Sequence, residues 1–138
     1  MRSVKLSDSV AVSAQIAPEH VAEIAAAGYK VLVNNRPDGE EPGQPSSAEM
    51  AARAAEAGLD YYHMPVTAGD FPGADFAAFR ALLDDPGRPV FAYCRSGTRC
   101  ANLWVASRAE GEVQAAADLA AGLGYDLGMA GRHLSRGD

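Results

Sequence analysis

Short apolar segments alternate with alanine-rich amphipathic segments along most of the chain. Four of the apolar segments have the length and composition of β-strands, and they cover residues 10–12, 29–35, 60–66 and 89–93. The longer segments between them favour helices. The pattern therefore predicts strands and helices in regular alternation.

Residues that begin and end helices mark the boundaries of these segments. Pro18 suits a first helical turn, and Gly28 and Gly58 suit helix C-caps. Ser46 or Ser47 is expected to cap the second helix. The expected helices cover residues 18–29, 48–58, 73–85, 99–110 and 113–123, and a short further segment follows over 125–135.

Strands that are separated by helices of ten or more residues require crossover connections, which produce a mostly parallel sheet covered on both faces. We therefore predict an α/β fold, with residues 1–138 forming one three-layer domain. Ligands bind such sheets beyond the carboxyl ends of the strands. The loops that follow Asn34, Val66 and Tyr93 are thus expected to converge on one face.

Composition narrows the possible partners and compartment. The net charge of −6, with scattered Lys and Arg, argues against a nucleic-acid partner. No apolar window approaches the roughly 18 residues of a membrane span, and the first residues do not resemble a signal peptide, so we expect a cytoplasmic protein. His20 and His133 lie in no ligand pattern, and we expect neither a metal nor a cofactor.

The segment after Tyr93 carries the sharpest chemical signal. A parallel strand that runs into Cys94 and then a helix places the thiol beside unpaired backbone amides, which bind anions. Gly97 permits the tight turn, and Arg95 and Arg99 add positive charge, so the pKa of the thiol should fall. Cys94 is therefore expected to be a nucleophile. Cys100 is either a small residue packed under the loop or a second functional thiol.

The sequence C-R-S-G-T-R at 94–99 resembles the active-site loop of rhodaneses, whereas tyrosine and dual-specificity phosphatases carry C-x5-R. The segments "VNNRPDGE", "HMPV", "YCRSGTR", "ANLW" and "GYDL" resemble, in order, the phosphatase-like domain of beta-lactamase hydrolase-like proteins, also described as a sulfur transferase family. The resemblance spans about Val12 to Leu127. It implies a dual-specificity-phosphatase-like fold, and a sulfide-oxidising or metallo-hydrolase protein as a partner. Two departures are Ala14, often glycine, and Cys100, usually a serine that assists the thiolate in related phosphatases.

A loop one residue shorter than that of phosphatases favours sulfur transfer, because it suits a terminal sulfur better than a phosphoryl group. Cys94 would attack a small sulfane sulfur donor and become a persulfide, with Arg95 and Arg99 orienting the donor. A thiol or cyanide would then take the sulfur. The remaining loop residues, Ser96, Gly97, Thr98 and Cys100, are expected to complete the anion site.

Two other functions stay open. A phosphatase would need a general acid; Ala68 occupies the usual aspartate position, and the nearest carboxylate is Asp70, which is also a plausible turn residue. Alternatively, Cys94 and Cys100 could form the reversible disulfide of a redox sensor.

Three residues of the neighbouring strands and loops have open roles. Arg36 could bind the substrate anion with Asp38 holding it, although a solvated turn ion pair is an equal possibility. His63 is expected to be a satisfied histidine near the core.

Overall fold

The computed structural model describes residues 3–136 and contains one five-stranded sheet with the strand order β1-β2-β5-β3-β4. Strands β2, β5, β3 and β4 run parallel, and only β1 is antiparallel to its neighbour. The strands span Ser3–Ser7 (β1), Val10–Ser13 (β2), Val31–Asn34 (β3), Asp60–His63 (β4) and Val90–Tyr93 (β5). The predicted mostly parallel sheet is confirmed.

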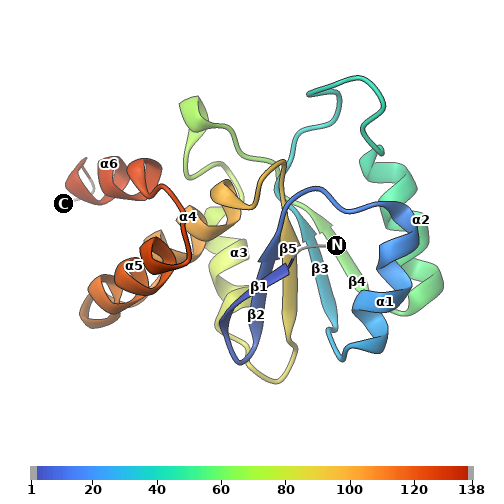
Figure 1. Ribbon diagram of the computed structural model, residues 1–138, viewed down its shortest axis with the longest axis horizontal. Coiled ribbons are helices and arrows are strands. Elements are labelled where there is room, and N and C mark those ends of the chain that lie inside the picture. Colours follow the sequence, from blue (N-terminus) through green and yellow to red (C-terminus); the bar gives the residue numbers. More distant parts are fainter. Residues whose placement is uncertain (1–2, 137–138) are drawn as a thin grey trace.

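Helices cover both faces of the sheet, α1 and α2 on one side and α3 to α6 on the other (Figure 1). The α-helices span Val21–Ala26 (α1), Ser47–Ala57 (α2), Phe76–Leu83 (α3), Thr98–Ala106 (α4), Val113–Gly122 (α5) and Gly128–Arg136 (α6). Three 3-10 turns span Pro18–His20 (η1), Ala68–Asp70 (η2) and Glu110–Glu112 (η3). The three-layer α/β architecture is therefore as predicted.

Alternate residues of the central strands feed two separate hydrophobic cores, one under each helical layer. Val12, Val33 and Ala92 pack with α3 to α6, whereas Leu32 and Phe91 pack with α1 and α2. All four residues of β2, β3 and β5 are buried. These strands are short apolar runs because neither face meets water.

Several predicted boundaries are correct, and their local chemistry explains them. The Ser46 hydroxyl accepts a hydrogen bond from the Glu49 amide and caps α2. That helix ends at Gly58, which adopts the left-handed conformation with φ of 81°. Among the described residues, no helix is both long and apolar enough to cross a membrane.

The structure also corrects the predicted elements. Strand β1 was not predicted, because its only buried residue is Leu6 and an edge strand of this kind lacks an apolar run. Strand β4 ends at His63 rather than at residue 66. Helix α4 ends at Ala106 rather than at residue 110, and the unassigned segment over 125–135 overlaps helix α6, which ends at Arg136.

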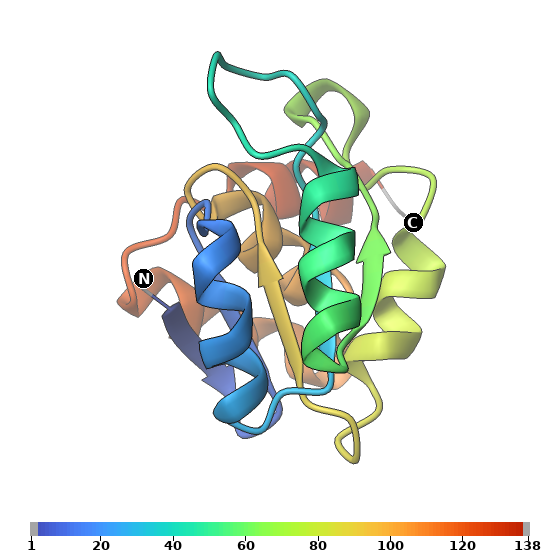
Figure 2. The same ribbon diagram turned by 90° about the vertical axis from the view of Figure 1, so that its right-hand side faces the viewer.

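The loops after β3, β4 and β5 meet at one edge of the sheet, as predicted. The Asn35 amide donates to the Tyr93 carbonyl at 2.8 Å, and the Val66 amide donates to the Asn35 carbonyl at 3.1 Å. The loop at 36–46 and the η2 turn both rise above this edge (Figure 2). Segments that are far apart in sequence therefore surround the end of β5, where Cys94 follows.

Candidate active site

The connection from β5 to α4 is a tight loop that wraps backbone amides around the Cys94 sulfur. The Gly97 amide donates a hydrogen bond to Sγ at 3.1 Å, and α4 begins at the next residue. Gly97 has φ of 90°, and a Cβ at this position would lie 3.3 Å from the Ser13 carbonyl carbon. Only glycine fits this conformation without displacing the backbone of β2, so the anion-binding loop depends on it.

Cys94 is fully buried, yet its thiolate is favoured. Hydrogen bonding from the Cys100 side chain is the largest cause that lowers the pKa of Cys94, to about 6. The Cys100 and Ser96 amides and the charge of Arg99 also lower this pKa, while burial opposes them. Most of the protein therefore carries an ionised Cys94 at neutral pH.

Cys100 has the opposite properties, and they explain how it helps Cys94. Burial raises the pKa of the Cys100 thiol well above its usual range, and the neighbouring Cys94 raises it further. Cys100 therefore stays protonated and donates its hydrogen bond to the Cys94 thiolate. It is packed beneath the loop, as expected for a small residue, and both cysteines are free thiols in this structure.

Arg99 lies at the start of α4 and is held by an acidic residue from the loop after β3. Its Nη1 and Nη2 atoms donate to the two carboxylate oxygens of Glu40, each at 2.8 Å. Nη1 also donates to the Val66 carbonyl at 2.9 Å. The hydrogen bond from Arg99 is the largest cause that lowers the pKa of Glu40, to about 2, so Glu40 remains ionised.

Arg36 holds Glu40 from the opposite side. Its side chain is fully buried, and Nε donates to Glu40 at 2.8 Å. Its Nη2 donates to Glu41 at 2.9 Å, and its Nη1 donates to Gln15 at 3.0 Å. Arg36 was expected to bind the substrate anion with Asp38, whereas in this structure its guanidinium is buried and bonded to Glu40, Glu41 and Gln15.

Asp38 also has a different role from the one expected. Its carboxylate accepts the Ser47 amide at 2.8 Å, at the beginning of α2. The expected Arg36–Asp38 pair is replaced by the two glutamates that follow in the same loop. The His63 ring bonds to the Arg36 carbonyl at 2.9 Å, so the interpretation of His63 as a satisfied histidine is confirmed.

Three further residues of the predicted site are exposed to solvent. The Arg95 side chain is 66% exposed and approaches Glu41 at 3.9 Å. Ser96 is exposed and its hydroxyl donates to that of Thr98 at 3.0 Å. Asp70 is exposed at the end of η2, four residues after Val66, whose carbonyl binds Arg99.

Sequence reasoning missed Glu40, Glu41 and Gln15. Glu40 and Glu41 follow the carboxyl end of β3, on the face that was predicted to receive the loop of Cys94. Two acidic residues in a loop expected to face Arg95 and Arg99 could have indicated an ion pair between the two loops. Gln15 gave none, because its contact depends on how the chain turns after β2.

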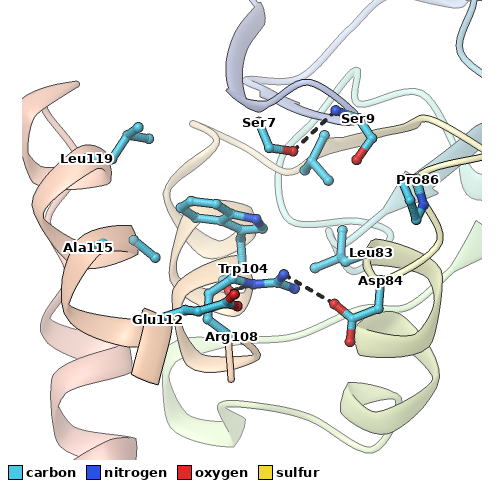
Figure 3. A pocket seen from close by; sticks show the side chains of 12 residues that line it. Ser7, Ser9, Leu83, Asp84, Pro86, Trp104, Arg108, Glu112, Ala115 and Leu119 are labelled. Carbon is cyan, nitrogen blue, oxygen red and sulfur yellow. Dashed lines mark hydrogen bonds and ion pairs between the residues drawn. The ribbon is translucent and has the colours of Figure 1, made fainter. Parts of the chain in front are cut away.

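A pocket of about 380 Å³ lies between the β1–β2 turn and helices α3, α4 and α5 (Figure 3). Val10, at the start of β2, lines it, whereas Cys94 follows the far end of the parallel strand β5. The pocket is lined by apolar side chains that include Val10, Leu83 and Trp104. At its wall, Arg108 pairs with Asp84 at 3.2 Å and lies 5.6 Å from the centre of the Trp104 ring. The lining contains neither Cys94 nor Cys100, so this pocket is separate from the loop of Cys94.

The chain is similar to known bacterial proteins over almost its whole length. Residues 2–111 match the family described as beta-lactamase hydrolase-like protein, phosphatase-like domain. Two relatives named beta-lactamase hydrolase-like protein, from Agrobacterium fabrum and Xylella fastidiosa, are each 35% identical over 99% of this chain. The chain spans only 32% of the length of these relatives.

Solved structures share the same fold. A Neisseria meningitidis protein described as a candidate phosphatase is 35% identical, with a TM-score of 0.70 over 86% of this chain and 87% of its own. Pseudomonas aeruginosa TpbA, at 19% identity, has a TM-score of 0.61 over 84% of this chain and 70% of its own. Tk-PTP in its active form, at 22% identity, has a TM-score of 0.57 over 76% and 70%. The fold is that of cysteine phosphatases, and the chain belongs to the family of the phosphatase-like domain of beta-lactamase hydrolase-like proteins.

Proposed function

We propose that this domain is a cysteine-dependent sulfurtransferase that carries sulfane sulfur as a persulfide on Cys94. The observation that carries the proposal is the short loop, which reaches Arg99 one residue earlier than the C-x5-R loop of phosphatases. The loop closes on a fully buried sulfur, with the Gly97 amide 3.1 Å away. A cradle of this size suits one added sulfur atom better than a phosphoryl group with three terminal oxygens.

The reaction needs no oxidant or reductant beyond its two substrates. The Cys94 thiolate attacks the outer sulfur of a persulfide or of thiosulfate, and the S–S bond of the donor breaks. The donor leaves with the electron pair, as a thiolate or as sulfite, and Cys94 becomes a persulfide. A second thiolate, or cyanide, then attacks the terminal sulfur, and Cys94 leaves as the thiolate.

The surrounding groups fit this chemistry. The loop amides and the Cys100 thiol stabilise negative charge on Cys94, and Arg99 with Arg95 attracts the anionic donor. Sulfite and thiolates are stable leaving groups at neutral pH, so no general acid is required. Asp70, which is exposed, therefore needs no role in this reaction.

A phosphatase is the second candidate, and specific observations favour it. The Neisseria relative that is described as a candidate phosphatase shares 35% of its residues, and the other neighbours have the phosphatase fold. In that reaction Cys94 would form a thiophosphate, and Asp70 would protonate the leaving alkoxide from the η2 turn, which begins two residues after the Val66 carbonyl that binds Arg99.

The two candidates separate in one set of assays on the purified domain. Thiocyanate formation from thiosulfate and cyanide, and phosphate release from an aryl phosphate, are measured for wild type, Cys94→Ser and Asp70→Asn. We expect sulfur transfer that falls at least about a hundredfold in Cys94→Ser and stays within about twofold in Asp70→Asn.

Phosphate release that depends on Cys94 and falls about a hundredfold in Asp70→Asn, without thiocyanate, would establish the phosphatase instead. Sulfur transfer that persists in Cys94→Ser would remove the proposed nucleophile.

A further inference from the structure

The contacts of Arg99 leave one particular edge of its guanidinium available. Five N–H groups project from an arginine side chain in a fixed plane. Three of them are engaged, because Nη1 donates to Glu40 and to the Val66 carbonyl, and Nη2 donates to Glu40. The two that remain, on Nε and Nη2, are parallel and lie along the same edge. This edge matches the two-atom face of a small anion.

Glu40 is itself fixed from several directions, unlike the acid of an ordinary surface ion pair. Its Oε1 atom accepts from Arg36 Nε at 2.8 Å, and its amide donates to the Gln44 side chain at 3.1 Å. Arg36 is fully buried and anchored in turn by Gln15 and Glu41. The carboxylate that grips Arg99 therefore has a set position relative to the sheet.

We propose that Glu40 is the positioning residue of this site, and that it holds Arg99 so that its Nε–Nη2 edge faces the anionic group over Cys94. The inference rests on the proposed function only for the identity of that anion. A phosphoryl group would meet the same edge.

Removing Glu40 should release Arg99 rather than merely weaken it. Arg99 would lose two of its three hydrogen bonds and would keep only the Val66 carbonyl. Arg36 and Arg99 would then face each other as two positive charges without the carboxylate between them. Since like charges repel, Arg99 should turn toward water and away from the loop.

Proximity of charges supports this arrangement. Glu40 is the main cause that raises the pKa of Arg99, and the charge of Cys94 raises it further. The other ionisable groups near Cys94 are the Cys100 thiol and the Tyr125 hydroxyl. Both stay protonated at neutral pH, because burial raises the pKa of each. Arg99 is thus the cation whose charge lowers the pKa of Cys94. Glu40 controls the position of the Arg99 side chain, because it accepts two of its hydrogen bonds.

The test uses two alkylating agents that neither candidate reaction requires. Iodoacetate carries a carboxylate and iodoacetamide is its neutral analogue, so the ratio of their rates at Cys94 measures how well the site presents Arg99 to an anion. We expect Glu40→Ala to lower this ratio about tenfold, as Arg99→Ala does. In the double variant the ratio should equal that of Arg99→Ala, because Glu40 acts through Arg99.

Glu49→Ala is the control. It removes the same charge from the first turn of α2, directly after the loop that carries Glu40, and Glu49 is exposed. Loss of a negative charge should by itself attract an anion, so this variant should not lower the ratio.

Two results would overturn the proposal. One is an alkylation-rate ratio that stays unchanged in Glu40→Ala. The other is a fall in this ratio on replacing Glu40 that is equally large whether residue 99 is Arg or Ala. If Glu40→Ala unfolds, Glu40→Gln enters the same cycle with its size preserved. The alkylation ratio can succeed or fail independently of thiocyanate formation, so the two proposals are tested separately.

Discussion

Cys94 and Cys100 show how one contact gives two identical side chains opposite chemistry. The Cys100 thiol is the hydrogen-bond donor that contributes most to the low pKa of Cys94, whereas burial, and then the contact with Cys94, raise the pKa of Cys100. One thiol is therefore ionised at neutral pH, and the other is a buried proton donor. A serine at position 100 would supply a donor of the same kind.

Replacing Cys100 should change the ionisation of Cys94 according to whether a donor remains. In wild type, the rate of alkylation by iodoacetamide should rise with pH around a midpoint of about 6. Cys100→Ala removes the donor, so the midpoint should move toward higher pH, whereas Cys100→Ser should keep it low. If Cys100→Ala retains the wild-type midpoint, the loop amides and Arg99 alone lower the pKa.

The parts of the site that are contiguous in sequence could be predicted, and those that depend on the path of a loop could not. The loop of Cys94, Gly97 and Arg99 forms from neighbouring residues between a strand and a helix, so its geometry follows from local rules. The partner of Arg36 cannot be predicted from local rules, because three carboxylates follow Arg36 within five residues and each could pair with it. Only the backbone path decides that Glu40 and Glu41 reach Arg36, while Asp38 reaches α2.

At the scale of elements, α4 links the loop of Cys94 to the C-terminal part of the domain. Asn102 on α4 is buried, and its Nδ2 donates to the Thr98 and Asp126 carbonyls, both at 2.8 Å. Its Oδ1 accepts the Ala130 amide at 2.9 Å. One side chain thus ties the first turn of α4 to α6 and to the segment before it.

Asn102→Ala should destabilise the domain by about 2–3 kcal/mol, because it leaves buried backbone groups without partners. The free energy of unfolding from urea titrations measures the loss. Gln114→Ala, which removes an exposed side chain on α5, should change it by less than about 0.5 kcal/mol. Equal effects of the two substitutions would contradict the role assigned to Asn102.

The elements that could be predicted are those with a clear hydrophobic period. Strands β2, β3 and β5 are buried on both faces and read as apolar runs. Helix α6 contains Gly128 and Gly131 and follows a turn, so its sequence carries weak helix propensity. Tertiary contacts override that propensity, since Asn102 fixes its first turn.

At the scale of the whole molecule, the parallel order of β2, β5, β3 and β4 brings three loops to one edge and makes the site a meeting point of distant segments. The bonds from Arg99 to Glu40 and to the Val66 carbonyl join the loops after β5, β3 and β4. The ionisation of Glu40 therefore affects the stability of the complete domain and not only that of the site.

This coupling predicts a component of acid sensitivity. The pKa of Glu40 is lowered from 4.5 to about 2, so between these pH values the unfolded chain binds more protons at Glu40 than the folded domain does. The stabilisation is complete above pH 4.5 and is lost as the pH falls through about 2. Urea unfolding of Glu40→Gln over this window should show a flatter pH dependence than wild type. Identical slopes would show that the ion pair contributes no net stability.

Helix α4 begins at the loop of Cys94 and carries Trp104, the single tryptophan of the chain, toward its other end. Indole emission responds to nearby charge and polarity, and here the Arg108 guanidinium lies 5.6 Å from the centre of the ring, beside an open pocket. The domain therefore contains its own optical reporter on the helix that follows the loop of Cys94. A reaction at Cys94 that shifts α4 is visible as a change in intrinsic fluorescence, without a label near the active thiol.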